Sequence, residues 1–145
     1  KRKPWLKGYV DVLSGDGDPQ DLTARSFDTL FATGHKFHGE MDLFLNLPVH
    51  AQQRGLIDAG GAAGMGIVKN LGVMATFHHF RAAASRPDDL KVFGNELDLK
   101  LIYKPLDLLS VDFFYGLFAP GDIFEAGKTD PKIEHFIYST VDFGF

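Results

Sequence analysis

The sequence predicts an all-β protein: an antiparallel transmembrane β-barrel to which this chain contributes about six to eight C-terminal strands of a larger whole. Three observations lead to this prediction: long segments with a period of two, short and long connections that alternate, and an aromatic residue closing the last segment. The 145 residues include 14 Phe. No apolar run reaches the roughly 18 residues that a membrane-spanning helix needs, so a helical membrane protein is not expected.

Six segments alternate between apolar and polar side chains, which places the two kinds on opposite faces of a strand. In chain order they span residues 5–13, 57–67, 71–77, 93–103, 109–117 and 133–145. Most are longer than the usual soluble strand of about five to six residues. Tilted strands that cross a bilayer need about 9 to 11 residues, which most of the segments supply. A half-buried soluble sheet also alternates and is the alternative.

The connections alternate in length as well. Lys69-Asn70 and Lys104-Pro105 are tight links, whereas roughly 14–54, 84–92 and 119–131 are long. Outer-membrane barrels have short periplasmic turns and long extracellular loops, so every tight link is assigned to the periplasmic side. We therefore expect residues 1–145 to form one barrel segment. Residues 14–54 are its long extracellular loop or an extra hairpin (27–33 with 37–45), and 55–145 a strand meander.

The polar face of these strands is expected to line an aqueous pore. The residues assigned to the pore wall are Lys7, Asp11, Asp58, Glu96, Asp98, Lys100, Asp112 and Asp142. With Glu134 included, two cations face seven carboxylates. Rings of fixed charge set the selectivity of a pore, and an exporter of a polyanion needs Arg or Lys at its constriction. Either such residues lie elsewhere in the barrel, or the permeant is a cation or a neutral solute.

One long segment does not follow a strand pattern. It reads Ser14-Gly15-Asp16-Gly17-Asp18, then Phe27-Asp28-Thr29-Leu30-Phe31, then His35-Lys36-Phe37-His38-Gly39-Glu40-Met41-Asp42-Leu43-Phe44. Together with Gly94-x-Glu96-Leu97-Asp98, these stretches resemble the C-terminal part of the alginate-export family of outer-membrane barrels. The resemblance implies a single chain of many more strands, of which this sequence matches the last third. It also implies export of anionic polysaccharide or the action of a porin.

The expected partners follow from the same pattern. The chain stops on Phe145, with Phe143 and Val141 on the same face, and this ending resembles the signature that barrel-assembly machinery recognises. Membrane lipid is expected along the apolar face, and Arg81 near the outer rim is placed to meet lipopolysaccharide phosphate. The permeant is a polysaccharide or a small polar solute. The net charge of −4 is spread out with no basic stripe, so no nucleic-acid partner is expected.

Residues 27–44 are expected to fold over the pore mouth as a gate, with His35, Lys36 and Asp42 touching the permeant. Asp16, Asp18 and Asp21 in a glycine-rich loop are a weak candidate for Ca²⁺, which takes about six to eight oxygen ligands. The alternative is that these carboxylates cap turns.

Other chemistry is weaker in the sequence. His78 and His79 are adjacent on a strand and therefore point to opposite faces, and His35 and His38 are interpreted as loop packing. Glu96 and Asp98 share a face, as a glycosidase pair would, but carboxylates are expected on any wet wall. No enzyme activity, bound metal or cofactor is therefore predicted.

The sequence thus predicts passive passage through a pore in the outer membrane of a Gram-negative bacterium. Two alternatives remain. One is a stave or sleeve within a larger outer-membrane complex. The inward positions of Phe114 and Phe136 favour this alternative. The other is a soluble β-domain with a binding groove.

Overall fold

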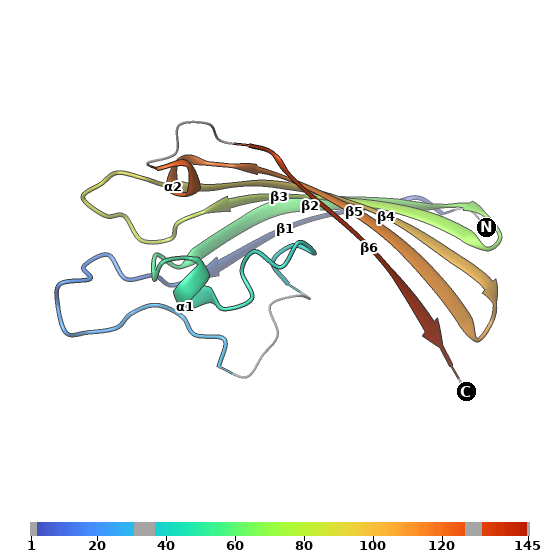
Figure 1. The fold of residues 1–145 in the computed structure, drawn as a ribbon, viewed down its shortest axis with the longest axis horizontal. Coiled ribbons are helices and arrows are strands. Elements are labelled where there is room, and N and C mark those ends of the chain that lie inside the picture. The colour runs from blue at the N-terminus through green and yellow to red at the C-terminus, as the bar shows by residue number, and fades with distance from the viewer. Residues whose placement is uncertain (1–2, 31–36, 127–131, 145) are drawn as a thin grey trace.

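The computed structural model describes residues 3–30, 37–126 and 132–144, and its main element is one curved antiparallel sheet (Figure 1). The strands are β1 (Trp5–Leu13), β2 (Leu56–Val68), β3 (Leu71–Arg81), β4 (Val92–Leu106), β5 (Leu109–Pro120) and β6 (Glu134–Phe143). Two short helices, α1 (Leu47–His50) and α2 (Asp122–Glu125), lie in the long connections. The predicted all-β, antiparallel architecture is confirmed.

Strands that follow one another in the chain are neighbours in the sheet, in the order β1-β2-β3-β4-β5-β6. Within the residues that the structure describes, β1 and β6 are the two edges, and the sheet does not close into a barrel. β1 begins and β6 ends at the end of the sheet where the tight turns are (Figure 1). The long connections gather at the opposite end, which we call the loop end. No helix in the described part of the chain is long and apolar enough to cross a membrane.

The positions of the two tight turns agree with the prediction in one case and differ from it in the other. The turn between β2 and β3 is at Lys69-Asn70, as predicted, but the second turn is at Asp107-Leu108. Its prediction at Lys104-Pro105 is wrong because β4 continues to Leu106 through a register shift. Proline has no N–H to donate to the neighbouring strand, and a bulge of this kind accommodates it.

The connection from β1 to β2 is a loop with α1 near its end. Within residues 14–30 and 37–55 the structure has no strand, so the alternative of a second hairpin arm at 37–45 is wrong. Gly39 (φ 83°) and Asp42 (φ 61°) both adopt left-handed backbone, which breaks the extended path that a strand needs. The part of that hairpin at 31–33 lies outside the described residues.

The strand register keeps most charged residues of the six strands on one face. Asp11 pairs with Asp58, His78 with Glu96, and Lys100 with Phe114. Paired residues point to the same side of a sheet. All eight residues assigned to the pore wall therefore share this face, which we call the inner face. The opposite, outer face exposes a continuous set of large apolar side chains: Leu6, Val10, Val12, Phe77, Leu97, Leu99, Phe113, Ile137, Val141 and Phe143.

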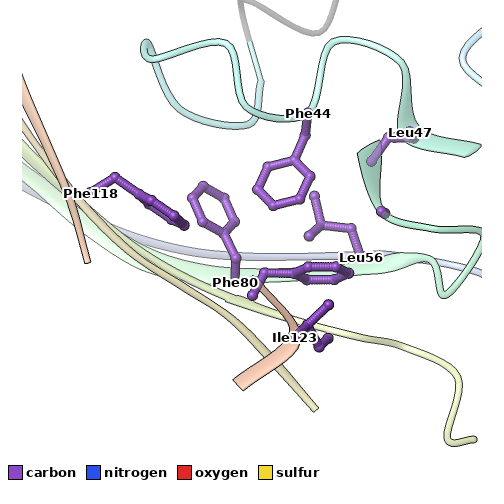
Figure 2. Packing of buried hydrophobic residues seen from close by; sticks show 8 residues of the cluster. Phe44, Leu47, Leu56, Phe80, Phe118 and Ile123 are labelled. Carbon is purple, nitrogen blue, oxygen red and sulfur yellow. The ribbon is translucent and has the colours of Figure 1, made fainter. Parts of the chain in front are cut away.

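The hydrophobic core lies at the loop end, between the inner face and the two short helices. Figure 2 shows Phe44, Leu47, Leu56, Phe80, Phe118 and Ile123 converging there. The ring of Phe44 is 4.7 Å from that of Phe80, so the loop before α1 is anchored to β3 by aromatic packing. This anchor positions the preceding residues over the inner face.

Phe93 is part of this core, although its place in the alternation predicts the outer face. Phe80 pairs with Gly94 and Arg81 with Val92, which leaves Phe93 as the extra residue of a β-bulge. The bulge reverses the direction of the Phe93 side chain, which is fully buried. Gly94 is needed beside it because a Cβ there would lie 2.4 Å from Cζ of Phe118.

Candidate functional site

Residues 37–46, which we call the inner loop, lie against the inner face on the concave side of the sheet (Figure 1). The N–H of Met41 donates to Oε1 of Glu96 at 3.0 Å, and the N–H of Glu40 donates to Oδ2 of Asp98 at 3.3 Å. Both carboxylates are buried, with 0% and 2% of their surface exposed. The pair that resembled a glycosidase dyad is thus covered by backbone.

Gly39 makes this close approach possible. Its φ of 83° is in the left-handed region that glycine adopts without a steric penalty. A Cβ at this position would lie 2.4 Å from Oε1 of Glu96. The loop backbone therefore sits directly on the carboxylate, with no room for a side chain between them.

Glu40 fastens the inner loop to two strands. Its Oε2 lies 2.5 Å from Nζ of Lys100 on β4 and accepts a hydrogen bond of 2.5 Å from the hydroxyl of Tyr138 on β6. The ring of Tyr138 stacks on Phe114 of β5 at 4.7 Å. Charge-assisted hydrogen bonds of this kind are the stronger ones, so Glu40 is a clamp across three strands.

A second polar cluster surrounds Asp58 on β2. Nδ1 of His78 lies 3.0 Å and 2.9 Å from the two carboxylate oxygens of Asp58 and 2.8 Å from the hydroxyl of Tyr9. The Tyr9 hydroxyl donates to the carbonyl of Phe77 at 3.0 Å. Its proton is therefore used there, and Nδ1 of His78 must carry a hydrogen to bind the carboxylate. This arrangement fixes the orientation of the Asp58 side chain.

His38 of the inner loop reaches the same cluster. Its Nδ1 is 3.9 Å from Oδ2 of Asp58, and Nε2 of His78 is 3.8 Å from Oδ2 of Asp98. One ligand atom each from Asp11, His38 and Asp58 lies within 4.8 Å of the others. These three are the residues in the described part of the chain that are placed to hold a metal ion. Asp11 borders a hollow of about 360 Å³ whose lining also includes Tyr9, His78 and Asp98.

The remaining wall residues lie elsewhere on the inner face, Lys7 next to this cluster and Asp112 and Asp142 toward the turn end. Lys7 stands over the ring of Tyr9, 5.4 Å from its centre. Asp112 accepts a hydrogen bond of 3.2 Å from Ser110 near the turn end of β5, and Asp142 is exposed on the edge strand β6. The structure thus brings Glu96, Asp98 and Lys100 under the inner loop, buries Asp58 beside His38 and His78, and leaves Asp11 and Asp142 exposed.

Of the three predicted gate residues, the structure describes only Asp42. His35 and Lys36 lie outside the described residues. Asp42 is on the inner loop and partly buried. Arg81 is exposed at the loop end of β3, on the outer face as predicted. Phe145 lies outside the described residues, so the recognition of this terminus by assembly machinery stays a prediction.

The three candidate calcium ligands cap turns, in agreement with the alternative interpretation. Asp16, Asp18 and Asp21 each accept a hydrogen bond from the backbone N–H two residues further on, at 2.9 to 3.1 Å. The hydrogen bond from Thr23, followed by the one from Arg25, holds the pKa of Asp21 below its ordinary value. One oxygen of each carboxylate is therefore used by the loop itself.

Several residues of the site were missed by sequence reasoning. Glu40 and Tyr138 were not assigned a role, and His38 was interpreted as loop packing. Only the fold of the long connection brings Glu40 and His38 to the inner face, where they meet Tyr138 of β6 and Asp58 of β2. Tyr9 and His78 had a usable signal, since the alternation places both on the polar side of their strands.

Comparison of the chain with protein-family models, with curated proteins and with solved structures found no match. The resemblance to the alginate-export family therefore stays a prediction.

Proposed function

We propose that this sheet is part of the wall of an outer-membrane β-barrel and that the inner loop narrows the pore. The observation that supports this most is the division of the sheet into two faces. The outer face exposes Phe113 (52%), Ile137 (75%) and Phe143 (70%), while charged residues gather on the inner face. An apolar band outside with a polar interior is typical of barrels that span the outer membrane.

The strand lengths are consistent with a membrane wall. β3 has 11 residues and β5 has 12. At about 3.3 Å per residue, 11 residues extend about 36 Å, and a tilt of about 45° reduces this to about 25 Å, the height of the apolar band of such barrels. The two sheet edges need strands that continue the wall, because an open edge in lipid leaves backbone groups without hydrogen bonds.

The charges of the inner face favour cations or neutral solutes over a polyanion. Lys100 is paired with Glu40, so its charge is compensated. Carboxylates that remain open on this face include Asp11, Asp112 and Asp142. Passage of small polar solutes is therefore our main proposal. Polysaccharide export rests on the sequence resemblance and needs basic residues from other parts of the barrel.

A sleeve around partner proteins is the second candidate. Phe136 is 40% exposed on the inner face, and a partner would meet its ring as an apolar surface. However, the inner loop already covers the part of this face next to Glu40. The space that remains on the inner face suits a small solute better than a protein partner. A soluble domain is a weaker interpretation because it would leave the apolar outer face in water.

Conductance across a planar bilayer tests the pore and the inner loop together. The protein is purified in detergent, its mass and heat-modifiability are measured, and it is then inserted into the bilayer. Glu40→Ala removes the clamp and is expected to raise single-channel conductance or opening frequency. Glu134→Ala, an exposed carboxylate on β6, is the matched control. A protein that forms no channels contradicts the proposal, and equal conductance of the two variants contradicts the role of the loop.

The reversal potential in a salt gradient tests the proposed permeant. An excess of open carboxylates predicts a sign that corresponds to cation preference. Replacing Asp11 and Asp112 by Asn is expected to reduce that preference. Anion preference of the parent protein would favour the polyanion interpretation instead.

A further inference from the structure

We propose that Asp11, His38 and Asp58 bind a divalent transition-metal ion of the Zn²⁺ type, which ties the inner loop to β1 and β2. The three residues come from three parts of the chain, and their ligand atoms lie within 4.8 Å of one another. This inference concerns an ion site at the inner face and does not depend on the protein conducting solutes.

His38 supplies the observation that points to a ligand. Its side chain is buried, with 7% of the residue exposed, and Nδ1 has no hydrogen-bond partner among the described residues. Oδ2 of Asp58 is 3.9 Å away, which is too far for a hydrogen bond. A buried polar nitrogen needs a partner, and an ion between His38 and Asp58 provides one.

Asp58 is prepared as a ligand by its neighbours. His78 donates from Nδ1 to the carboxylate at 2.9 Å and 3.0 Å and holds it in place. Ligating carboxylates in metal sites are in turn hydrogen-bonded by such outer groups, which orient them toward the ion. His78 therefore acts as a positioning residue in this site.

Asp11 gives the ion an open side. It is exposed on β1, pairs with Asp58 in the sheet register, and borders the 360 Å³ hollow. An ion of the Zn²⁺ type bonds imidazole and carboxylate ligands at about 2.0 to 2.2 Å, so ligand atoms must come closer than 4.8 Å. Asp11 is able to make that adjustment because its side chain is exposed. Water from the hollow fills the remaining position.

The ligand set selects the class of ion. Imidazole nitrogen suits Zn²⁺ and related transition metals, whereas Ca²⁺ and Mg²⁺ prefer oxygen ligands alone. Binding would join His38 on the inner loop to two strands, opposite the point where Glu40 joins the loop to β4 and β6. An ion at this position would therefore stabilise the loop in its observed place.

The test is metal binding by the purified, folded protein after treatment with a chelator. Zn²⁺ is titrated in by calorimetry, and Co²⁺ is used as a probe because its visible absorption reports nitrogen and oxygen ligands. We expect one ion per chain. Asp11→Asn, an exposed substitution that leaves the fold intact, is expected to weaken binding by at least about tenfold, and His78→Gln by about 10- to 100-fold.

Asp112→Asn on β5 is the matched control and should bind Zn²⁺ as the parent protein does. The loss of one ion per chain in Asp58→Asn, with an unchanged circular-dichroism spectrum, would complete the assignment. The proposal is overturned if the parent protein binds no Zn²⁺ in stoichiometric amount, or if Asp11→Asn binds it with unchanged affinity. Channel activity enters none of these readouts, so a failure of the pore proposal is recognised separately.

Discussion

The N–H of Met41 donates a 3.0 Å hydrogen bond to Oε1 of Glu96, 55 residues further along the chain. The bond joins the inner loop to the centre of the sheet and gives a fully buried carboxylate one of its partners. A buried polar group is tolerated only when it is hydrogen-bonded, so the position of the loop and the burial of Glu96 depend on each other.

Gly39→Ala is expected to displace the inner loop. The new Cβ would lie 2.4 Å from Oε1 of Glu96, and φ of 83° is unfavourable for alanine by about 1–2 kcal/mol. We expect a lower free energy of unfolding by at least that amount and faster amide exchange at Met41. Gly72→Ala is the control, because its Cβ would meet the nearest atom at 3.6 Å. Equal stability of the two variants would contradict the close contact.

Phe44→Ala is expected to detach the loop from the core. Phe44 is 1% exposed and contacts Phe80 and Phe93 with ring centres at 4.7 and 5.3 Å. Removing a buried phenylalanine side chain costs about 3–5 kcal/mol, which denaturant unfolding measures. Val49→Ala on α1, at 65% exposure, should change the free energy of unfolding by less than about 0.5 kcal/mol. A small effect at Phe44 would mean that the core does not hold the loop.

Much of the sheet could be predicted because its signal is local. The period of two assigns Lys7, Glu96 and Lys100 to one face without knowledge of the neighbours, and the register confirms that assignment. The prediction was wrong where one extra residue reverses the alternation. Phe93 lies at such a bulge, and nothing in its own segment distinguishes it from Leu97 or Leu99.

The candidate site could be predicted only in part, because half of it comes from the inner loop. Glu40 and His38 are separated by long stretches of chain from Lys100 and Asp58, and the contacts depend on Phe44 packing at the loop end. Long-range packing of this kind leaves no periodic pattern in the sequence. The second tight turn was predicted at the wrong place for a local reason. Pro105 was interpreted as part of the turn, but a β-bulge accommodates it within β4, and the turn follows at Asp107-Leu108.

Acid is expected to loosen the connection between β3 and β4. The hydrogen bond from Arg54 holds the pKa of Asp88 below its ordinary value, and Arg54 is buried. A lowered folded-state pKa stabilises the fold above the ordinary aspartate value of about 3.9. That contribution is lost as the pH falls below this value and through the lowered pKa.

Amide protection at Ala83 and Ala84 measures the effect, because both N–H groups bind the carbonyl of Arg54. In the parent protein, the protection of these two amides should decrease as the pH is lowered. In Asp88→Asn it should depend less on pH. Asp89→Asn, whose side chain is 82% exposed, is the control and should behave as the parent does. The same pH profile in all three proteins would show that Asp88 does not hold this connection.

Leu99→Arg is expected to be costly only if the outer face meets lipid. Leu99 lies at the middle of β4 on that face and is 41% exposed in the isolated sheet. Arginine near the midplane of a bilayer costs a barrel about 2–4 kcal/mol. In water an exposed position tolerates it within about 0.5 kcal/mol. Unfolding by urea in phospholipid vesicles measures the difference, with Thr140→Arg on the inner face of β6 as the control. A large cost at Leu99 alone would support the membrane wall, and equal small costs at both positions would contradict it.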